Sequence, residues 1–290
     1  MKQRLISFDW AIKKLLRNKA NFEILEGFLS ELIAPDKNIK IIKLLESESN
    51  KNSADDKLNR VDILVEIEPD DIVLIEVQVN RELDFLHRMI FGTSKIITEY
   101  LAEGEAYAKI KKVYSVNILY FDLGHGKDYV YRGTTDFVGI HNKERLQLNE
   151  RQKSLYKKES ISAIYPEYYL IKVNNFNNLA KNTLDEWIYF LKNEEIKPNF
   201  HAKGLLKAKE KFDILNLPEE ERKAYEKYQD NLHYQASMVD SSYGEGKYEG
   251  KKERGLEIAS NMLKKNMPIT DISELTGLSI EAIEKLAKNS

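Results

Sequence analysis

Hydrophobic residues recur with a helical period near the start of the chain. Apolar positions in residues 8–16 and again in residues 22–33 have helical spacing, which predicts two amphipathic helices. Pro35 marks the end of the second one, because proline does not continue a helix. Residues 39–45 are a short strand candidate, and the polar stretch 47–57 has no periodicity and predicts a loop.

After this loop the pattern changes to β-branched runs. Residues 60–67 and 72–79 are two such runs, and the Pro-Asp-Asp turn between them predicts an antiparallel hairpin. A helix over residues 83–101 and a buried strand over residues 113–121 are expected next. Two shorter strand candidates follow, at residues 129–132 and 168–173. The strand–helix–strand order after the hairpin predicts an α/β fold with a mixed sheet.

The second half of the chain has a helical pattern from residue 182 onward. Four glycines interrupt a charged stretch in it, and each glycine weakens a helix by about 1 kcal/mol. We therefore expect three parts: a large domain with a helical extension over residues 1–240, a glycine-punctuated linker or helix over 241–257, and a small helical unit over 258–290.

Composition narrows the classes of protein that the chain can belong to. The 290 residues carry a net charge of -2, so a nucleic-acid contact has to come from local basic patches. The absence of cysteine excludes disulfide scaffolds, thiolate zinc sites and cysteine nucleophiles. Charged residues interrupt the apolar positions of the first helix, and no apolar run has the length of a membrane span. We expect a cytoplasmic protein that makes no membrane contact.

Alternation along the hairpin separates two faces with different chemistry. Aliphatic residues occupy one face, whereas Asp62, Glu76 and Gln78 lie on the other, with Asp62 opposite Glu76. Two carboxylates in this position have Cβ atoms about 5 Å apart and repel each other unless a cation lies between them. Mg²⁺ suits such oxygen ligands, with Mn²⁺ as a substitute. The alternative is a half-solvated sheet face whose acids contact only water.

These residues, together with others along the chain, resemble a known family. Asp62 followed by Glu76-Val77-Gln78 on the next strand is similar to the PD-(D/E)XK nuclease superfamily, with Gln in place of the final Lys. Within it, the chain resembles the recombination-promoting nuclease and transposase family. The opening Asp9-Trp-Ala-Ile-Lys13-Lys14-Leu15 element, the FLSELI, DILVE and GEAY segments, Arg88 and the strand ending ILYFDL carry the resemblance.

The resemblance implies a restriction-endonuclease-like αβββαβ core and Mg²⁺-dependent hydrolysis of DNA phosphodiesters. It implies that Asp62 and Glu76 ligate the metal, with the Val77 carbonyl as a third ligand. Gln78 departs from the superfamily pattern, because a neutral amide offers only hydrogen bonds where a lysine offers a positive charge. Arg81, Arg88 and Lys95 recur every seven residues and share one face if the helix is continuous, with Leu86, Ile90, Ile97 and Leu101 as the core positions opposite. We expect Arg88 to contact DNA phosphate, the alternative being a solvated helix face. Asp9 is a further acid expected near this site.

The terminal unit contains a helix-turn-helix pattern centred on Gly277, with Ser279 as the cap of the second helix. Glu281 and Glu284 lie on that helix, where a groove-reading helix favours Arg, Lys or Asn. We therefore favour a packing module, or homo-oligomer formation through these helices, over DNA recognition.

Three functions are compatible with these patterns. The first is a metal-dependent DNA endonuclease linked to transposition or recombination. The second is a catalytically weak or inactive nuclease fold that serves as a DNA-binding or interaction module, which Gln78 keeps open. The third is another two-carboxylate enzyme such as a glycosidase, which predicts an aromatic sugar cleft around the two acids.

Overall fold

A computed structural model describes residues 5–45, 62–101 and 104–288 of the chain. The predicted loop at 47–57 and the first residues of the predicted hairpin lie outside the described residues. The helices of the first 222 residues are α1 (Phe8–Lys14), α2 (Phe22–Ile33), α3 (Phe85–Glu99), α4 (Glu150–Tyr156), α5 (Thr183–Asn193) and α6 (Leu205–Lys211). The strands are β1 (Ile41–Leu44), β2 (Ile63–Ile67), β3 (Asp71–Gln78), β4 (Val113–Leu119), β5 (Val130–Gly133) and β6 (Glu167–Lys172).

The six strands form one mixed sheet in the order β1-β2-β3-β4-β6-β5. Strands β1, β2 and β3 are antiparallel neighbours, whereas β3, β4 and β6 run parallel. Strand β5 pairs antiparallel with β6 at the edge. The order α2-β1-β2-β3-α3-β4 confirms the predicted αβββαβ core, and the mixed sheet confirms the α/β class.

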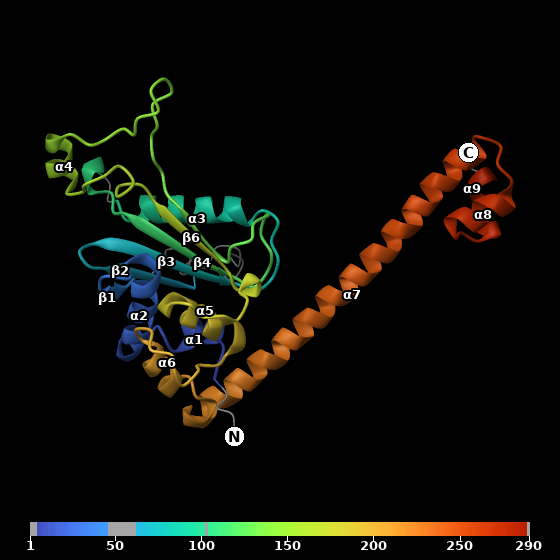
Figure 1. Ribbon diagram of the computed structural model, residues 1–290. Helices are drawn as coiled ribbons and strands as arrows, with labels where there is room; N and C mark the ends of the chain where they lie inside the picture. Colours follow the sequence, from blue (N-terminus) through green and yellow to red (C-terminus); the bar gives the residue numbers. More distant parts are fainter. Residues whose placement is uncertain (1–4, 46–61, 102–103, 289–290) are drawn as a thin grey trace. The chain divides into compact units, whose positions relative to one another are not determined.

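Helices cover both faces of this sheet, as Figure 1 shows: α3 lies on one face, and α1, α2, α5 and α6 lie on the other. The second group is held together by edge-to-face aromatic contacts, in which Phe8 and Phe28 pack around Trp187. Such pairs add about 1 kcal/mol each to the stabilisation from burial. The first helix is thereby fixed against α2 and α5.

The polar face of the hairpin is more covered than its sequence pattern predicts. Leu64 of β2 and Leu74 of β3 lie on the same face as the acids, but they are buried against Ile96 of α3. This face is therefore core along most of its length. Polar residues lie at its two ends. Glu66 at one end is paired with Lys43 and Lys111, whereas the end with Glu76 and Gln78 is where a site can form.

The buried face of α3 is one residue away from the predicted one. The helix buries Phe85, Met89 and Ile96, whereas Leu86 and Ile90, which were expected in the core, are exposed. The helix also begins at residue 85, so Arg81 precedes it and does not share a helical face with Arg88. The predicted shared face therefore does not include Arg81, whereas Arg88 and Lys95 both lie on α3.

Residues 223–290 form a second compact unit, described here by itself. Helix α7 (Glu219–Leu263) includes the glycine-punctuated stretch, and α8 (Ile269–Thr276) and α9 (Ile280–Lys288) follow it. Ala259, Ile272 and Ile283 form the core of this unit. Gly277 has a φ of 69°, and the Ser279 hydroxyl accepts a hydrogen bond from the Ala282 N–H, as the helix-turn-helix pattern predicts.

None of the helices in the described part of the chain is both long and apolar enough to cross a membrane.

Candidate active site

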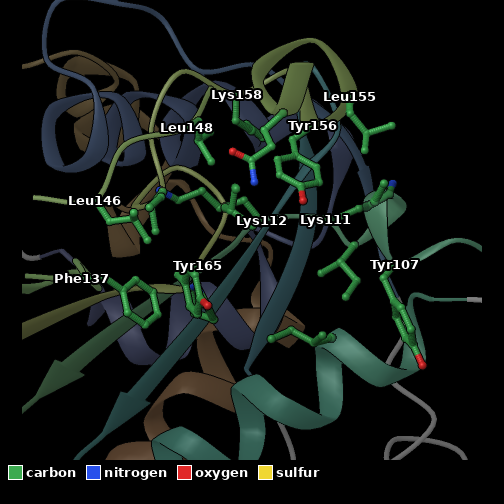
Figure 2. A pocket seen from close by; sticks show the side chains of 17 residues that line it. Tyr107, Lys111, Lys112, Phe137, Leu146, Leu148, Leu155, Tyr156, Lys158 and Tyr165 are labelled. Carbon is green, nitrogen blue, oxygen red and sulfur yellow. The ribbon is translucent and has the colours of Figure 1, made fainter. Parts of the chain in front are cut away.

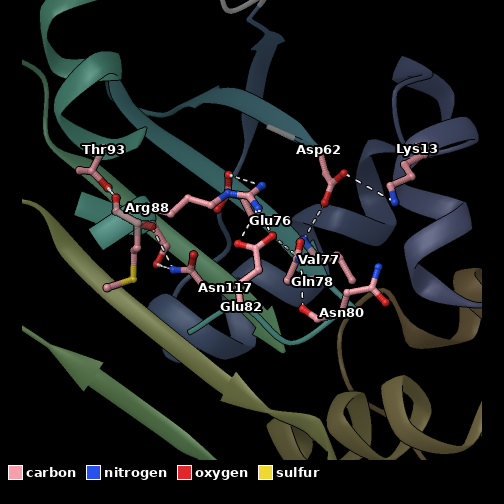
Figure 3. Close-up of polar contacts among 12 residues, drawn as sticks. Lys13, Asp62, Glu76, Val77, Gln78, Asn80, Glu82, Arg88, Thr93 and Asn117 are labelled. Atoms are coloured by element: carbon pink, nitrogen blue, oxygen red, sulfur yellow. Dashed lines mark hydrogen bonds and ion pairs between the residues drawn. The ribbon is translucent and has the colours of Figure 1, made fainter. Parts of the chain in front are cut away.

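Asp62 lies immediately before β2, at the open end of the hairpin. The strand ladder ends at the pair Ile63–Ile75, and the Asp62 carboxylate then accepts a hydrogen bond of 2.6 Å from the Val77 N–H. The side chain thus continues the ladder by one bond and is held beside β3 (Figure 3). Burial raises the pKa of the Asp62 carboxyl, although Lys13 and the Val77 N–H both favour its ionised form.

Glu76 lies on β3 beside Asn117 of β4, under the first turn of α3. Its side chain is 11% exposed, and the guanidinium of Arg88 is 4.0 Å from its carboxylate. Burial raises the pKa of Glu76 to about 7; Arg88 opposes this rise, and the negative charge of Asp62 adds to it. The pairing of Ile63 with Ile75 makes Asp62 and Glu76 the next positions across the two strands.

Gln78 is hydrogen-bonded within the protein rather than free to meet a ligand. Its amide nitrogen donates to Glu82 at 2.8 Å and to the Asn80 carbonyl at 3.1 Å. Arg88 donates to both oxygens of the same Glu82 carboxylate, at 2.7 and 2.9 Å. Glu82 thus connects Gln78 to Arg88 at the end of β3.

Helix α1 supplies the other side of the site. The Lys13 ammonium is 2.6 Å from Asp9 and 3.9 Å from the Asp62 carboxylate. One turn further on, the Arg17 guanidinium donates to the Asp62 backbone carbonyl at 2.6 Å. Asp9 is therefore near the site, as expected, but Lys13 lies between it and Asp62.

The donor set fits a hard divalent cation. Asp62 and Glu76 offer carboxylate oxygens at one end of the hairpin, and Mg²⁺ commonly takes one or two carboxylates together with water and phosphate oxygens. Across residues 5–45, 62–101 and 104–288, no cluster of three or more His, Asp or Glu side chains is placed to hold a metal. Any further ligands have to come from backbone, water or substrate.

Sequence reasoning missed three members of this site. Lys13 falls within the opening element, and its spacing of four residues from Asp9 signals a shared helix face, yet no role followed from it. Glu82 lies between β3 and α3, where the sequence has no helical or strand periodicity that would indicate its position. Asn117 is a polar residue in an apolar strand; its amide donates to Ser115 and to the Tyr169 carbonyl, and the residue is fully buried.

A cavity of about 730 Å³ lies elsewhere, near the amino-terminal ends of β3 and β4 (Figure 2). Its lining is largely aliphatic and aromatic and contains no Asp or Glu. Lysines at its wall are paired with acids of the sheet: Lys112 with Glu167 at 2.7 Å and Lys158 with Asp71 at 2.8 Å. The aromatic cleft that a glycosidase would need around its two acids is therefore not formed by this cavity.

The sheet order, its covering helices and the αβββαβ core define a PD-(D/E)XK nuclease-like fold. Residues 6–242 match the family described as PD-(D/E)XK nuclease family transposase, and the chain belongs to this family. The matched region contains both proposed ligand acids and the α1 residues beside them. Comparisons with curated proteins and with solved structures found no match. Membership indicates a nuclease- or transposase-related role; nucleases of this kind act on DNA and usually use divalent metals.

Proposed function

We propose that the protein is a metal-dependent DNA endonuclease associated with transposition or recombination. The observation that supports this function best is the arrangement of Asp62 and Glu76 at the open end of the hairpin, within a chain of this family. Asp62, Glu76 and the Val77 carbonyl would hold Mg²⁺, or Mn²⁺ in its place. Arg88 would contact DNA phosphate.

The residues of the chain contribute to this chemistry in distinct ways. The Val77 N–H orients the Asp62 carboxylate, and burial leaves the Glu76 carboxyl group poorly solvated. The bound metal would polarise a phosphoryl oxygen and lower the pKa of a bound water. Glu82 holds Arg88 and Gln78 together, so that these three side chains form one wall of the site.

The first prediction concerns the two acids. Replacing Asp62 by Asn, or Glu76 by Gln, is expected to abolish nicking of supercoiled plasmid in Mg²⁺, because each loses an anionic metal ligand. Asp70→Asn is the matched control, since Asp70 is an exposed acid in the turn of the same hairpin. Cleavage by Asp62→Asn at the wild-type rate would contradict this site.

The alternative function, a nuclease fold that binds DNA or a partner without turnover, is favoured by the hydrogen bonds that occupy Gln78. Calorimetric titration with Mn²⁺ separates the two functions. The alternative would be favoured if the wild type binds Mn²⁺ but does not cleave DNA, and if Asp62→Asn no longer binds Mn²⁺. The division at residues 240 and 257, homo-oligomer formation through the C-terminal helices and a cytoplasmic location stay predictions.

A further inference from the structure

Lys13 is a half-exposed cation held at the candidate metal site. Its side chain is 43% exposed, whereas that of its partner Asp9 is 6% exposed. The 2.6 Å ion pair with Asp9 fixes the ammonium, and Asp62 lies 3.9 Å from it (Figure 3). An ammonium has three donors, so these two ion pairs leave one for a ligand.

The two other candidates for a positive charge at the reacting phosphate are less suited. Gln78 is neutral, and its amide nitrogen already donates to Glu82 and Asn80. Arg88 is 23% exposed and donates to both oxygens of Glu82. Lys13 is more accessible than Arg88 and borders the ligand acid that Arg88 does not touch.

We propose that Lys13 is a catalytic residue that supplies, from helix α1, the positive charge absent at position 78. This inference rests on the proposed nuclease function. In hydrolysis the water oxygen bonds to phosphorus, the bond from phosphorus to one sugar oxygen breaks, and a proton from the water ends on that oxygen. The Lys13 ammonium stabilises the negative charge that grows on the phosphoryl oxygens during this exchange. Asp9 is a positioning residue for Lys13.

The primary test measures plasmid nicking in Mg²⁺ by the full chain with Lys13→Gln. We expect kcat to fall about a hundredfold with little change in KM, because the lost interaction acts on the transition state. Lys14→Gln is the matched control: Lys14 is the next residue on the same helix, is exposed, and has no ion pair recorded within the described residues. It is expected to retain the wild-type kcat.

Moving the charge provides a second, sharper test. Adding Gln78→Lys to the Lys13→Gln variant places an ammonium at the position that the superfamily pattern uses. We expect the kcat of this double variant to be at least ten times that of Lys13→Gln. Lys13→Arg, which keeps the charge, is expected to retain more activity than Lys13→Gln. Recovery with Gln78→Lys but not with a Gln78→Met control would attribute the effect to charge.

Binding measurements separate a catalytic role from a structural one. Mn²⁺ affinity by calorimetry, DNA affinity by fluorescence anisotropy in Ca²⁺, and the unfolding temperature are expected to stay near wild type in Lys13→Gln. Wild-type cleavage by Lys13→Gln would overturn the role of Lys13 and leave the nuclease function standing. Loss of Mn²⁺ binding in this variant would also overturn it. A wild-type protein without metal-dependent cleavage would overturn the nuclease function itself.

Discussion

At the residue scale, two buried acids differ in how far their negative charge is compensated by hydrogen-bond donors and cations. Glu167 is buried and accepts hydrogen bonds from Lys112, Arg132 and the Tyr169 hydroxyl at 2.6–2.7 Å. Burial alone would raise its pKa, but these bonds outweigh burial and hold the pKa below its ordinary value. Among the residues that the structure describes, Glu76 has no comparable set of donors, and its pKa rises. Uncompensated burial distinguishes the site acid from the structural one.

Glu167 therefore predicts a pH-dependent contribution to stability. A carboxyl whose pKa is lower in the folded protein stabilises it above the pKa of the unfolded chain, and this contribution disappears as the pH falls through the folded pKa. Glu167→Gln is expected to lower the free energy of unfolding by about 3 kcal/mol at pH 7, because Lys112 loses its buried partner.

Urea unfolding of both proteins between pH 7 and pH 3 measures this difference. The difference should narrow as the pH falls below the ordinary pKa of a glutamate carboxyl group. Glu150→Gln, which changes an exposed acid paired with Lys153 on the surface, is the control and should show little effect at any pH. A difference that stays constant over this range would contradict the role of the carboxylate charge.

At the element scale, the sequence predicts where helices and strands lie better than which face they bury. Matching parity along β2 and β3 places Asp62 opposite Glu76, since side chains alternate along a strand. Helix α3 carries two apolar stripes offset by one residue, one at Phe85, Met89 and Ile96 and the other at Leu86 and Ile90. Periodicity cannot choose between them, because the choice depends on contacts with β3 and β4.

This difference predicts unequal costs for two neighbouring truncations. Phe85→Ala removes a fully buried ring in contact with Phe121 and is expected to cost about 3–5 kcal/mol of stability. Leu86→Ala truncates a side chain that is 46% exposed and is expected to cost less than about 1 kcal/mol. Chemical denaturation of the two variants measures both values. A larger cost for Leu86→Ala would support the face predicted from the sequence.

At the scale of the whole molecule, the near-neutral charge restricts how DNA is held. The cations at the site are few, with Lys13 and Arg17 exposed beside Asp62 and Arg88 largely enclosed. Sequence patterns predicted the helices, the strands and the mixed sheet because hydrophobic periodicity is a local property, whereas the αβββαβ core was implied by the family resemblance. They could not predict the contact of Lys13 with Asp62, because these residues are far apart in the chain and meet only when α1 packs beside the hairpin.

The small number of cations predicts a shallow salt dependence of DNA binding. Each phosphate contact contributes a slope of about -0.9 to log K against log salt, so contacts by Arg17 and Arg88 give a slope of about -2, with Lys13 acting on the transition state and not on binding. Anisotropy titrations of a short duplex in Ca²⁺ at several NaCl concentrations measure the slope. Arg17→Gln should reduce its magnitude by about 1. A wild-type slope steeper than about -6 would indicate a broad basic surface instead.

The hydrogen bond from the Val77 N–H to Asp62 has a spectroscopic consequence. The amide proton of Val77 senses the charge and position of the Asp62 carboxylate directly, so its NMR shift should respond when a cation binds there. In a sample with ¹⁵N-labelled valine, the assigned amide signal of Val77 would report whether a cation occupies the site. Cation binding would then be followed in the resting protein, at the backbone, without DNA or turnover.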